Sequence, residues 1–320
     1  SAPRWRSRTV GVRLMRLKLG RPDITRYRNR FDVPPAHRDS AVAITWLGVS
    51  TLLVDDGTSA VLTDGFFSRP TLREVGLRRL HTSESRVEEC LTRAGIDRLA
   101  AVLPVHTHYD HALDCSAVAL RTGAYVVGGA STANIARGHG LSEERIVVAS
   151  PGVEMRFGSF SVTLIESHHC PPDRFPGAIT APVIPPAKAS AYRCGETWST
   201  LIHHRPSNQR ALIQGSAGFV PGALNGHRAD VVYLGVGQLG VQPRSYIRQY
   251  WKETVRAVDA QRVVLIHWDD FFRPLTDQLR ALPYAVDDLD MSMTVLDSMA
   301  ESDGVALHLP RLWQRADPWA

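Results

Sequence analysis

The sequence holds little cysteine and no long apolar run. Only four of its 320 residues are cysteine, which excludes a small fold held together mainly by disulfides. No stretch reaches the roughly 18 consecutive apolar residues that suggest a transmembrane helix, so the sequence predicts no membrane span. Hydrophobic residues make up 44% of the chain and charged residues 22%, which is typical of a globular domain.

Negative charge is scarce at the N-terminal end. Residues 1–30 hold nine Arg and one Lys against Asp23 alone, a charge of +9, so the total of +5 leaves −4 for the rest. We interpret residues 1–39 as a basic arm and residues 40–320 as one domain, which is a common length for a four-layer sandwich. The arm is suited to an anionic membrane surface, or it is a solvated lead-in. The acidic body disfavours nucleic acid as a partner.

Three of the 13 histidines and one aspartate fall within six residues, His106-Thr107-His108-Tyr109-Asp110-His111. They follow the apolar residues 99–105, which predict a buried strand that ends where these polar groups begin. In an extended segment alternate side chains share a face, so His106 and His108 can bind one cation.

The chain then turns into a predicted helix at 112–121, which directs Asp110 and His111 toward a second point. Imidazole nitrogen and carboxylate oxygen are typical ligands of Zn²⁺. The sequence therefore predicts one or two bound Zn²⁺ ions, with Mn²⁺ or Fe²⁺ as alternatives.

The H-x-H-x-D-H pattern resembles the signature of the metallo-β-lactamase superfamily. Residues 46–54 and 62–68 resemble the branch that includes N-acyl phosphatidylethanolamine phospholipase D and the ascorbate-phosphate lactonases, and the similarity runs from about 41 to about 273. The resemblance implies an α/β fold, a four-layer αβ/βα sandwich with the metal site at one edge of its two sheets. It does not imply a substrate, because one fold supports many activities.

The resemblance also implies the remaining ligands. After a predicted strand at 160–166, either His168 or His169 would join His106 and His108 on the first metal; His169 fits the branch pattern better, and His168 would then face the substrate or support a ligand. His267, after the predicted strand 262–266, would join Asp110 and His111 on the second metal. The residues expected to support ligands or contact substrate are Asp64, Tyr109, His168, Ser216 and Asp269. For Asp64 the alternative is a helix or turn cap.

Ser216 is the main departure from the superfamily pattern, which has an aspartate bridging both metals at the corresponding strand end. With Asp110 as the sole anionic ligand, two divalent ions would leave a large uncompensated positive charge. We therefore expect weak occupancy of the second metal site. Ser216 would contribute a neutral oxygen or a hydrogen bond to water.

A long irregular segment, residues 168–196, contains six prolines. Such loops in compact domains are usually functional, so we expect a stiff wall beside the metals or, alternatively, a surface insertion. The expected lining is Phe175, Ile179, Val183, Ile184 and Tyr192. A disulfide between Cys170 and Cys194 would close this loop if the protein is exported; in the cytoplasm Cys170 would be a free thiol.

The expected activity is that of a metal-dependent hydrolase, in which a metal-activated hydroxide attacks an ester or phosphodiester. Asp110 and His111 would be catalytic, with Asp110 holding or accepting the proton. The basic arm and the apolar loop favour a lipid-like small-molecule substrate. The alternatives are a lactone hydrolase of the same fold and a non-catalytic scaffold that binds a metal or an anion. The chain starts at Ser1, so we expect a processed or trimmed terminus; compartment and oligomeric state stay open.

Overall fold

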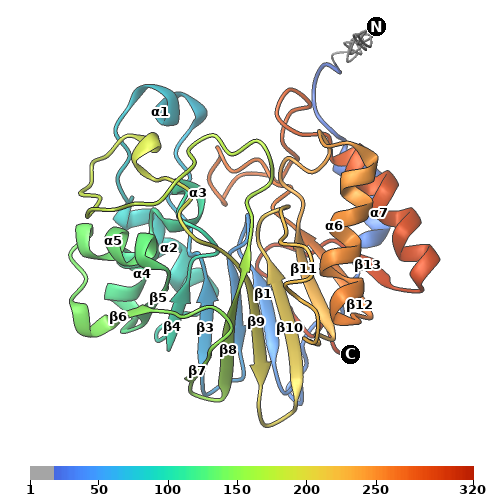
Figure 1. The fold of residues 1–320 in the computed structure, drawn as a ribbon, viewed down its shortest axis with the longest axis horizontal. Coiled ribbons are helices and arrows are strands. Elements are labelled where there is room, and N and C mark those ends of the chain that lie inside the picture. The colour runs from blue at the N-terminus through green and yellow to red at the C-terminus, as the bar shows by residue number, and fades with distance from the viewer. Residues whose placement is uncertain (1–17) are drawn as a thin grey trace, which may run out of the picture.

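The structure is a computed structural model that describes residues 18–320. Two seven-stranded sheets face each other, and helices lie outside them (Figure 1). The large apolar core between the sheets includes Ile44 and Leu103 of one sheet and Val162 and Leu212 of the other. These layers confirm the predicted four-layer α/β sandwich.

The first sheet has the strand order β14-β1-β2-β3-β4-β5-β6. Its strands are β1 (Ala43–Trp46), β2 (Leu52–Asp55), β3 (Ala60–Thr63), β4 (Ala101–Leu103), β5 (Tyr125–Gly128), β6 (Ile146–Val148) and β14 (Arg315–Ala316). Strands β3 to β6 are parallel. On β4, Leu103 faces the core between the sheets and Val102 faces a second core under the helices. Both faces are therefore buried, which explains the unbroken apolar run of this strand.

The second sheet has the order β13-β12-β11-β10-β9-β8-β7. Its strands are β7 (Glu154–Phe157), β8 (Phe160–Ser167), β9 (Thr197–His204), β10 (Gln209–Gln214), β11 (Val231–Gly235), β12 (Arg262–Ile266) and β13 (Ala306–His308). Because β9 is antiparallel to both β8 and β10, and β10 to β12 are parallel, β8, β10 and β12 end at the same edge of the sheet. That edge receives His169, Ser216 and His267.

Helices cover the outer face of each sheet (Figure 1). The helices on the side of the first sheet are α1 (Leu72–Leu77), α2 (Glu84–Ala94), α3 (Tyr109–Ala112), α4 (Cys115–Thr122) and α5 (Ala130–Gly138), and those beside the second are α6 (Arg244–Thr254) and α7 (Leu289–Asp303). Short 3₁₀ helices are η1 (Ile24–Arg30), η2 (Glu143–Arg145), η3 (Ala189–Ala191) and η4 (Arg256–Val258). Between residues 18 and 320, no helix is long and apolar enough to cross a membrane.

The helix predicted at 112–121 begins later than expected, as α4 at Cys115, and residues 109–112 form the separate helix α3. The Asp114 carboxylate between them accepts hydrogen bonds from the N–H groups of Phe67 and Ser68. The sequence also predicts a helix at 274–281 and a loose tail at 313–320, and both predictions are wrong. Residues 274–281 form a loop that pairs with residues 269 and 270 through backbone contacts, and the tail contains β14, which pairs with β1.

The described part of the basic arm lies against the domain. Four of its cations pair with aspartates: Lys18 with Asp288 at 2.5 Å, Arg21 with Asp270 at 3.1 Å, Arg26 with Asp290 at 3.7 Å and Arg30 with Asp297 at 2.6 Å. The first 17 residues of the predicted arm lie outside the described residues. Contact of the arm with a membrane stays a prediction.

Candidate metal centre

The end of β4 presents the cluster of histidines. After Leu103 the chain bends at Val105, His106 and His108, and α3 then begins at Tyr109 and contains Asp110 and His111. His106 and His111 are fully buried. A bent segment at the strand end, rather than the extended one that we expected, therefore carries the first side chains, and the helical turn of α3 carries the second.

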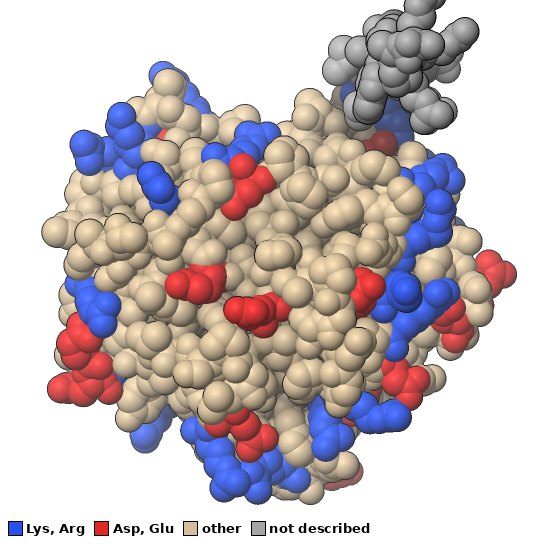
Figure 2. All heavy atoms as spheres, viewed as in Figure 1, with Lys and Arg blue, Asp and Glu red and all other residues tan. Residues whose placement is uncertain are grey.

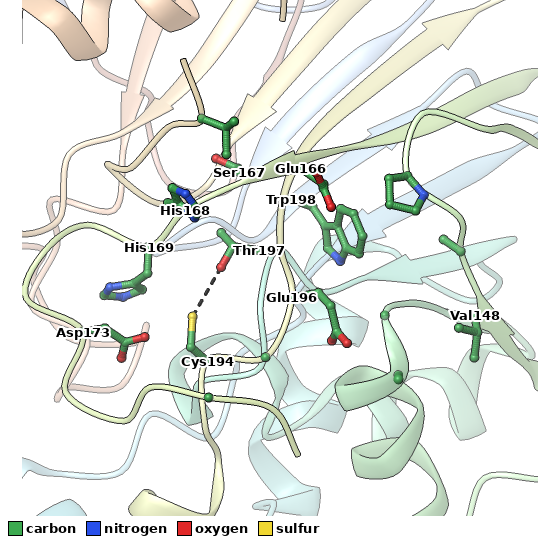
Figure 3. Close-up of a pocket in the computed structure, with 17 residues that line it drawn as sticks. Val148, Glu166, Ser167, His168, His169, Asp173, Cys194, Glu196, Thr197 and Trp198 are labelled. Carbon is green, nitrogen blue, oxygen red and sulfur yellow. Dashed lines mark hydrogen bonds between the residues drawn. The ribbon is translucent and has the colours of Figure 1, made fainter. Parts of the chain in front are cut away.

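The first set, called here the first metal group, consists of His106, His108 and His169. Nε2 of His106 lies 3.1 Å from Nδ1 of His108. Nδ1 of His169 donates a hydrogen bond of 2.6 Å to the carbonyl oxygen of Cys170, which leaves Nε2 free for a metal. His168, by contrast, is exposed. Figure 3 shows the His169 ring turned toward Asp173 and the His168 ring away from it.

The second metal group consists of Asp110, His111 and His267. Oδ2 of Asp110 lies 3.5 Å from Nε2 of His111 and 3.6 Å from Nε2 of His267. Asp64 supports the group from behind, since its Oδ2 lies 2.8 Å from Nδ1 of His111 and accepts the Ser50 hydroxyl at 2.6 Å. Of the two roles predicted for Asp64, the structure shows the one in which it orients an imidazole.

The backbone is strained beside this group. Asp64 has φ 54°, His267 has φ 60° and Val49 has φ 48°, in the left-handed region that non-glycine residues rarely adopt. The His267 N–H donates to the Val49 carbonyl oxygen at 2.9 Å, which joins the two strained segments. A Cβ at Gly237 would lie 2.8 Å from Nδ1 of His267, so the imidazole occupies space that only glycine leaves. Strain of this kind gathers at functional sites.

Burial and neighbouring charges shift the pKa values of several residues in the two groups, and burial lowers the pKa of His267 in the second group as well. Burial, with the neighbouring imidazoles, holds the pKa of His106 well below its usual value and lowers that of His169 to about 4. Burial also opposes charge on His111, but Asp64 and Asp110 outweigh it and raise its pKa. For Asp110, burial is outweighed by His111, His267 and His108, which lower its pKa. His106 and His169 of the first group are therefore neutral near pH 7, and the second group contains a carboxylate.

These two sets of atoms fit a pair of metal ions. With the His111 Nδ1 side taken by Asp64, the buried Nε2 has no hydrogen-bond partner within residues 18–320, as expected for a nitrogen that faces a cation. The 3.1 Å between the His106 and His108 nitrogens is close to the separation, about 3.3 Å, of two ligands on a tetrahedral ion with bonds of 2.0–2.1 Å. The donor set of imidazole and carboxylate suits Zn²⁺, and it also suits iron.

Asp269 does not contact His267 in the way we predicted. Its carboxylate accepts the Val49 N–H at 2.9 Å and forms a fully buried ion pair with Arg69. Asp270 instead pairs with Arg21 and Arg280. Nδ1 of His267 has no partner in the described chain. Asp269 therefore acts on His267 only indirectly, because it holds the Val49 loop whose carbonyl accepts the His267 N–H.

Ser216 lies at the end of β10 and is buried. Its hydroxyl oxygen accepts the Cys170 N–H at 3.0 Å, so it holds the turn that follows His169. Of the two alternatives for Cys170 and Cys194, a disulfide or free thiols, the structure has the free thiols. Their thiols have other neighbours: Cys194 lies 3.3 Å from the Thr197 hydroxyl and Cys170 3.8 Å from the Gln242 amide nitrogen.

Sequence reasoning missed Asp173. Its Oδ1 lies 3.1 Å from Nε2 of His108, on the side of the ring away from His106. Burial raises the pKa of Asp173, but the neighbouring His108 outweighs it and lowers that pKa to about 2. The ionised carboxylate lies beside Nε2 without forming a hydrogen bond to it, so its effect on the ring is that of a neighbouring charge. A signal existed, since Asp173 and Glu196 are the two acidic residues in 168–196.

A cleft of about 120 Å³ opens at the two metal groups. Its floor includes His108, Asp110 and His169, and Tyr109 lies in its wall. Apolar side chains make up much of the remaining lining, and an exposed Arg174 stands at its edge. The apolar members are Leu72, Phe175, Phe271, Phe272 and Val286.

Of the loop residues expected to line this cleft, Phe175 does so, with its ring centroid 6.2 Å from that of His108. Ile179, Val183 and Tyr192 are instead buried in the core under the helices, and Ile184 is 72% exposed. The loop is therefore anchored by most of its apolar side chains. Phe271 and Phe272, from the segment after His267, form the opposite wall.

Comparison with solved structures identifies the architecture. A putative metal-dependent hydrolase from Parabacteroides distasonis superposes on 88% of this chain and 99% of its own, with a TM-score of 0.53 and 12% identity. The chain has the metallo-β-lactamase fold. CmlA, a diiron β-hydroxylase from Streptomyces venezuelae, superposes on 88% of this chain and 54% of its own, with a TM-score of 0.54 and 13% identity.

In sequence, the chain is similar to a UPF0173 metal-dependent hydrolase from Rhizobium leguminosarum bv. trifolii. The two are 31% identical over 126 residues, which is 39% of this chain and 47% of the relative, so the match spans about half of that protein. No family model matches the chain. The branch with N-acyl phosphatidylethanolamine phospholipase D, suggested by residues 46–54 and 62–68, is not confirmed by these comparisons.

Proposed function

We propose that this protein is a metal-dependent hydrolase that cleaves an ester or phosphodiester bond. The observation that carries the proposal is the pair of buried metal groups, which share the segment 106–111 and open into one cleft. The names of the Rhizobium leguminosarum relative and of the Parabacteroides distasonis structure, both metal-dependent hydrolases, support it. The diiron CmlA has the same fold, so the choice between zinc and iron is part of the test.

Different residues would have different roles in hydrolysis. A divalent ion held by these groups lowers the pKa of a water molecule and polarises the bond to be cleaved. Asp110 lies between His111 and His267 at the floor of the cleft, where its carboxylate can hold or accept a proton from the attacking water. Asp64 keeps the proton of His111 on Nδ1 and so keeps Nε2 available.

The walls of the cleft favour a substrate with an apolar part and an anionic centre. Phe175, Phe271 and Phe272 provide aromatic surface beside Asp110 and His169, which suits an acyl or aryl group. Arg174 at the edge can pair with a phosphate oxygen. These features favour a lipid-like phosphodiester over a simple ester. A lactone, which has no such charge, would make no use of Arg174.

The test is metal-dependent turnover. Protein stripped with a chelator and reloaded with Zn²⁺, Mn²⁺ or Fe²⁺ is assayed on bis(p-nitrophenyl) phosphate and on p-nitrophenyl butyrate, with metal content measured by elemental mass spectrometry. We expect turnover that requires the metal and is faster on the phosphodiester. Bound metal without turnover of either substrate would refute the hydrolase and favour the non-catalytic scaffold.

Two neighbouring histidines provide a matched pair of variants. His169→Ala should lower the metal content and abolish turnover, because His169 belongs to the first metal group. His168→Ala should keep the full metal content, because His168 is exposed at the adjacent position. Equal metal loss in both variants would show that the strand end, rather than the His169 imidazole, controls metal binding.

A further inference from the structure

A third set of potential metal ligands lies next to the first metal group. It consists of His108, Asp173 and Cys194, whose ligand atoms all lie within 4.8 Å of one another, the same limit that holds for the two metal groups. A nitrogen, an oxygen and a sulfur donor therefore meet in one place. The hydrolytic role proposed above makes no use of this third set.

His108 belongs to two sets through the two nitrogens of its ring. Its Nδ1 lies 3.1 Å from Nε2 of His106, on the side of the first metal group. Its Nε2 lies 3.1 Å from Oδ1 of Asp173, on the other side of the ring. Because the two ring nitrogens point in different directions, an ion at Nε2 does not displace an ion at Nδ1.

Nε2 of His108 is a buried polar atom without a hydrogen bond. The side chain is 8% exposed, and within residues 18–320 this nitrogen has no hydrogen-bond partner, although the Asp173 carboxylate lies beside it. Buried nitrogens are normally paired. Since Asp173 itself covers this nitrogen, a cation there would lie between the two side chains. Their 3.1 Å separation is close to the roughly 3.3 Å between nitrogen and oxygen ligands on a tetrahedral zinc ion.

Cys194 adds a buried thiol to these two donors. It is 5% exposed and forms no disulfide. Its Sγ lies 3.3 Å from the Thr197 hydroxyl, and Figure 3 shows both this sulfur and the Asp173 carboxylate below the His169 ring. Zinc binds thiolate, imidazole and carboxylate, whereas Mg²⁺ and Ca²⁺ prefer oxygen ligands. The donor set therefore favours a zinc-like ion.

Backbone hydrogen bonds hold the three residues in place. The Cys194 N–H donates to the Phe175 carbonyl oxygen at 2.8 Å, and the Thr107 N–H donates to the Cys194 carbonyl oxygen at 2.9 Å. Oδ1 of Asp173 accepts the Phe175 N–H at 2.9 Å, which orients the carboxylate. The three chain segments are therefore joined beside the site, so an ion that binds there pays little to order its ligands.

The third set borders a cavity of about 680 Å³, whose wall includes Asp173, Cys194 and Thr197. The remaining carboxylates of its lining are Glu166 and Glu196, and among the described residues the lining has no Lys or Arg. Figure 2 shows acidic side chains near the middle of the face in view, with most basic ones toward the outline. A cavity of this charge raises the local concentration of cations and gives an ion access to the site.

We propose that His108, Asp173 and Cys194 form a third metal site, which binds Zn²⁺ through Nε2, a carboxylate oxygen and a thiolate. The thiol proton leaves to solvent when the ion binds, because a coordinating thiol is deprotonated. When the first metal group is also filled, the His108 ring gives up its remaining proton to solvent and joins the two ions as an imidazolate. With three protein ligands, a fourth position is left open for water. The site does not depend on the proposed function, because it requires no turnover.

The experiment uses Co²⁺ as a spectroscopic substitute for Zn²⁺. Metal-free protein, reduced with a phosphine that carries no thiol, is titrated with Co²⁺ in the absence of oxygen until all sites are saturated. We expect a thiolate-to-cobalt charge-transfer absorption in the near ultraviolet, which imidazole and carboxylate ligands do not produce. Equilibrium dialysis against Zn²⁺, followed by elemental mass spectrometry, should show one ion more than the two metal groups hold.

Variants identify the thiolate. Cys194→Ala should abolish the absorption and remove one Zn²⁺ ion per chain. Cys170→Ala is the matched control, because it removes another buried thiol close to His169 that lies outside the third set, and it should keep the absorption. Asp173→Asn, at a partly exposed position, serves if Cys194→Ala does not fold. It should shift half-saturation of the absorption to about tenfold higher free Co²⁺, the effect of one lost charge.

Bound Co²⁺ without the thiolate absorption in the wild-type protein would overturn the proposal. An absorption that persists in Cys194→Ala, that is lost in Cys170→Ala or that Asp173→Asn leaves unshifted would overturn it as well. These outcomes are separate from those of the hydrolase test. A chain that shows the absorption and cleaves neither p-nitrophenyl substrate retains the third site and refutes the hydrolase. One that cleaves a p-nitrophenyl substrate without the absorption is a hydrolase without the third ion.

Discussion

The first and second metal groups use different chemistry to prepare similar sites. The first has three imidazoles and no carboxylate among its ligands, and a carboxylate, Asp173, lies behind one ring. The second contains Asp110 and has the buried Asp64 behind His111. Each group takes two ligands from the segment 106–111 and the third from a strand end of the second sheet, His169 after β8 and His267 after β12. Three imidazole ligands favour metal binding in the first group, whereas the negative charge of Asp110 favours metal binding in the second.

The comparison bears on the replacement of the bridging aspartate by Ser216. From the sequence we expected the second site to be weak, because Asp110 would be the sole anionic ligand. The structure places two further carboxylates, Asp64 as predicted and Asp173 in addition, each beside a ligand imidazole. Carboxylates that contact the ligands reduce the net positive charge of a metal centre even when they do not touch the ion.

Removal of one ligand from each group should have the largest effect. His106→Ala and His267→Ala should each reduce hydrolysis to the uncatalysed rate, because each dismantles one group while the fold survives. Elemental mass spectrometry should show that each variant loses metal, and circular dichroism should show unchanged secondary structure. Full activity in both variants would refute the proposed mechanism.

Removal of the supporting carboxylates should have the next largest effect. Asp64→Asn should weaken metal binding about 10- to 100-fold, the usual cost of losing a carboxylate behind a ligand histidine. Asp173→Asn should cost about tenfold, the low end of that range, because the Asp173 side chain is 22% exposed and partly solvated. Zn²⁺ affinity is measured by competition with a chromophoric chelator. If Asp173→Asn loses more Zn²⁺ affinity than Asp64→Asn, Asp173 contributes more to metal binding than Asp64, contrary to this prediction.

Restoring a carboxylate at Ser216 should have a smaller effect of opposite sign. Ser216→Asp should tighten binding of the second ion about tenfold, the effect of roughly 1.4 kcal/mol from one added charge. Ser216→Asn, which has the same shape without the charge, is the control and should not tighten it. If Ser216→Asp has the affinity of the wild-type protein in the same chelator competition, Ser216 lies outside the metal site.

The smallest expected effect is on the pH dependence of stability in the metal-free protein. Lowering the pH should change the free energy of unfolding in opposite directions through His169 and His111. The pKa of His169 is about 4 in the folded state and near 6.5 when unfolded. Above pH 6.5 both states are neutral; between pH 6.5 and 4 only the unfolded state binds the proton, so the free energy of unfolding falls as pH falls. The raised pKa of His111 has the opposite effect, since its contribution is present below pH 6.5 and is lost as pH rises.

Urea unfolding at pH 7 and pH 5 checks this sign. Relative to the wild-type protein, His169→Gln should lose less stability on acidification, by on the order of 1 kcal/mol. His111→Gln should lose more, because the group that gains stability in acid is gone. An identical response of both variants to pH would show that the two groups do not differ in their protonation.

Much of the centre was predictable because its geometry is local. The spacing of His106, His108, Asp110 and His111 depends on a strand end and one helical turn, both of which the sequence indicates. The ends of β8 and β12 placed His169 and His267 by the same reasoning combined with the resemblance. The parallel strands were recognisable from apolar runs such as residues 99–105. The short β7 and α1 escaped the sequence reading, and the Pro274–Ala281 segment was wrongly predicted as a helix.

The sequence by itself determined the histidine cluster, the strand ends and the layered fold, since these follow from periodicity over a few residues. Apart from Asp64, only the tertiary structure decided which groups support the ligands. Asp269 binds Arg69, 200 positions away, and Glu166 meets Trp198 only because β8 and β9 pair in one register. Such partners depend on how distant segments pack together, and no local pattern encodes that packing.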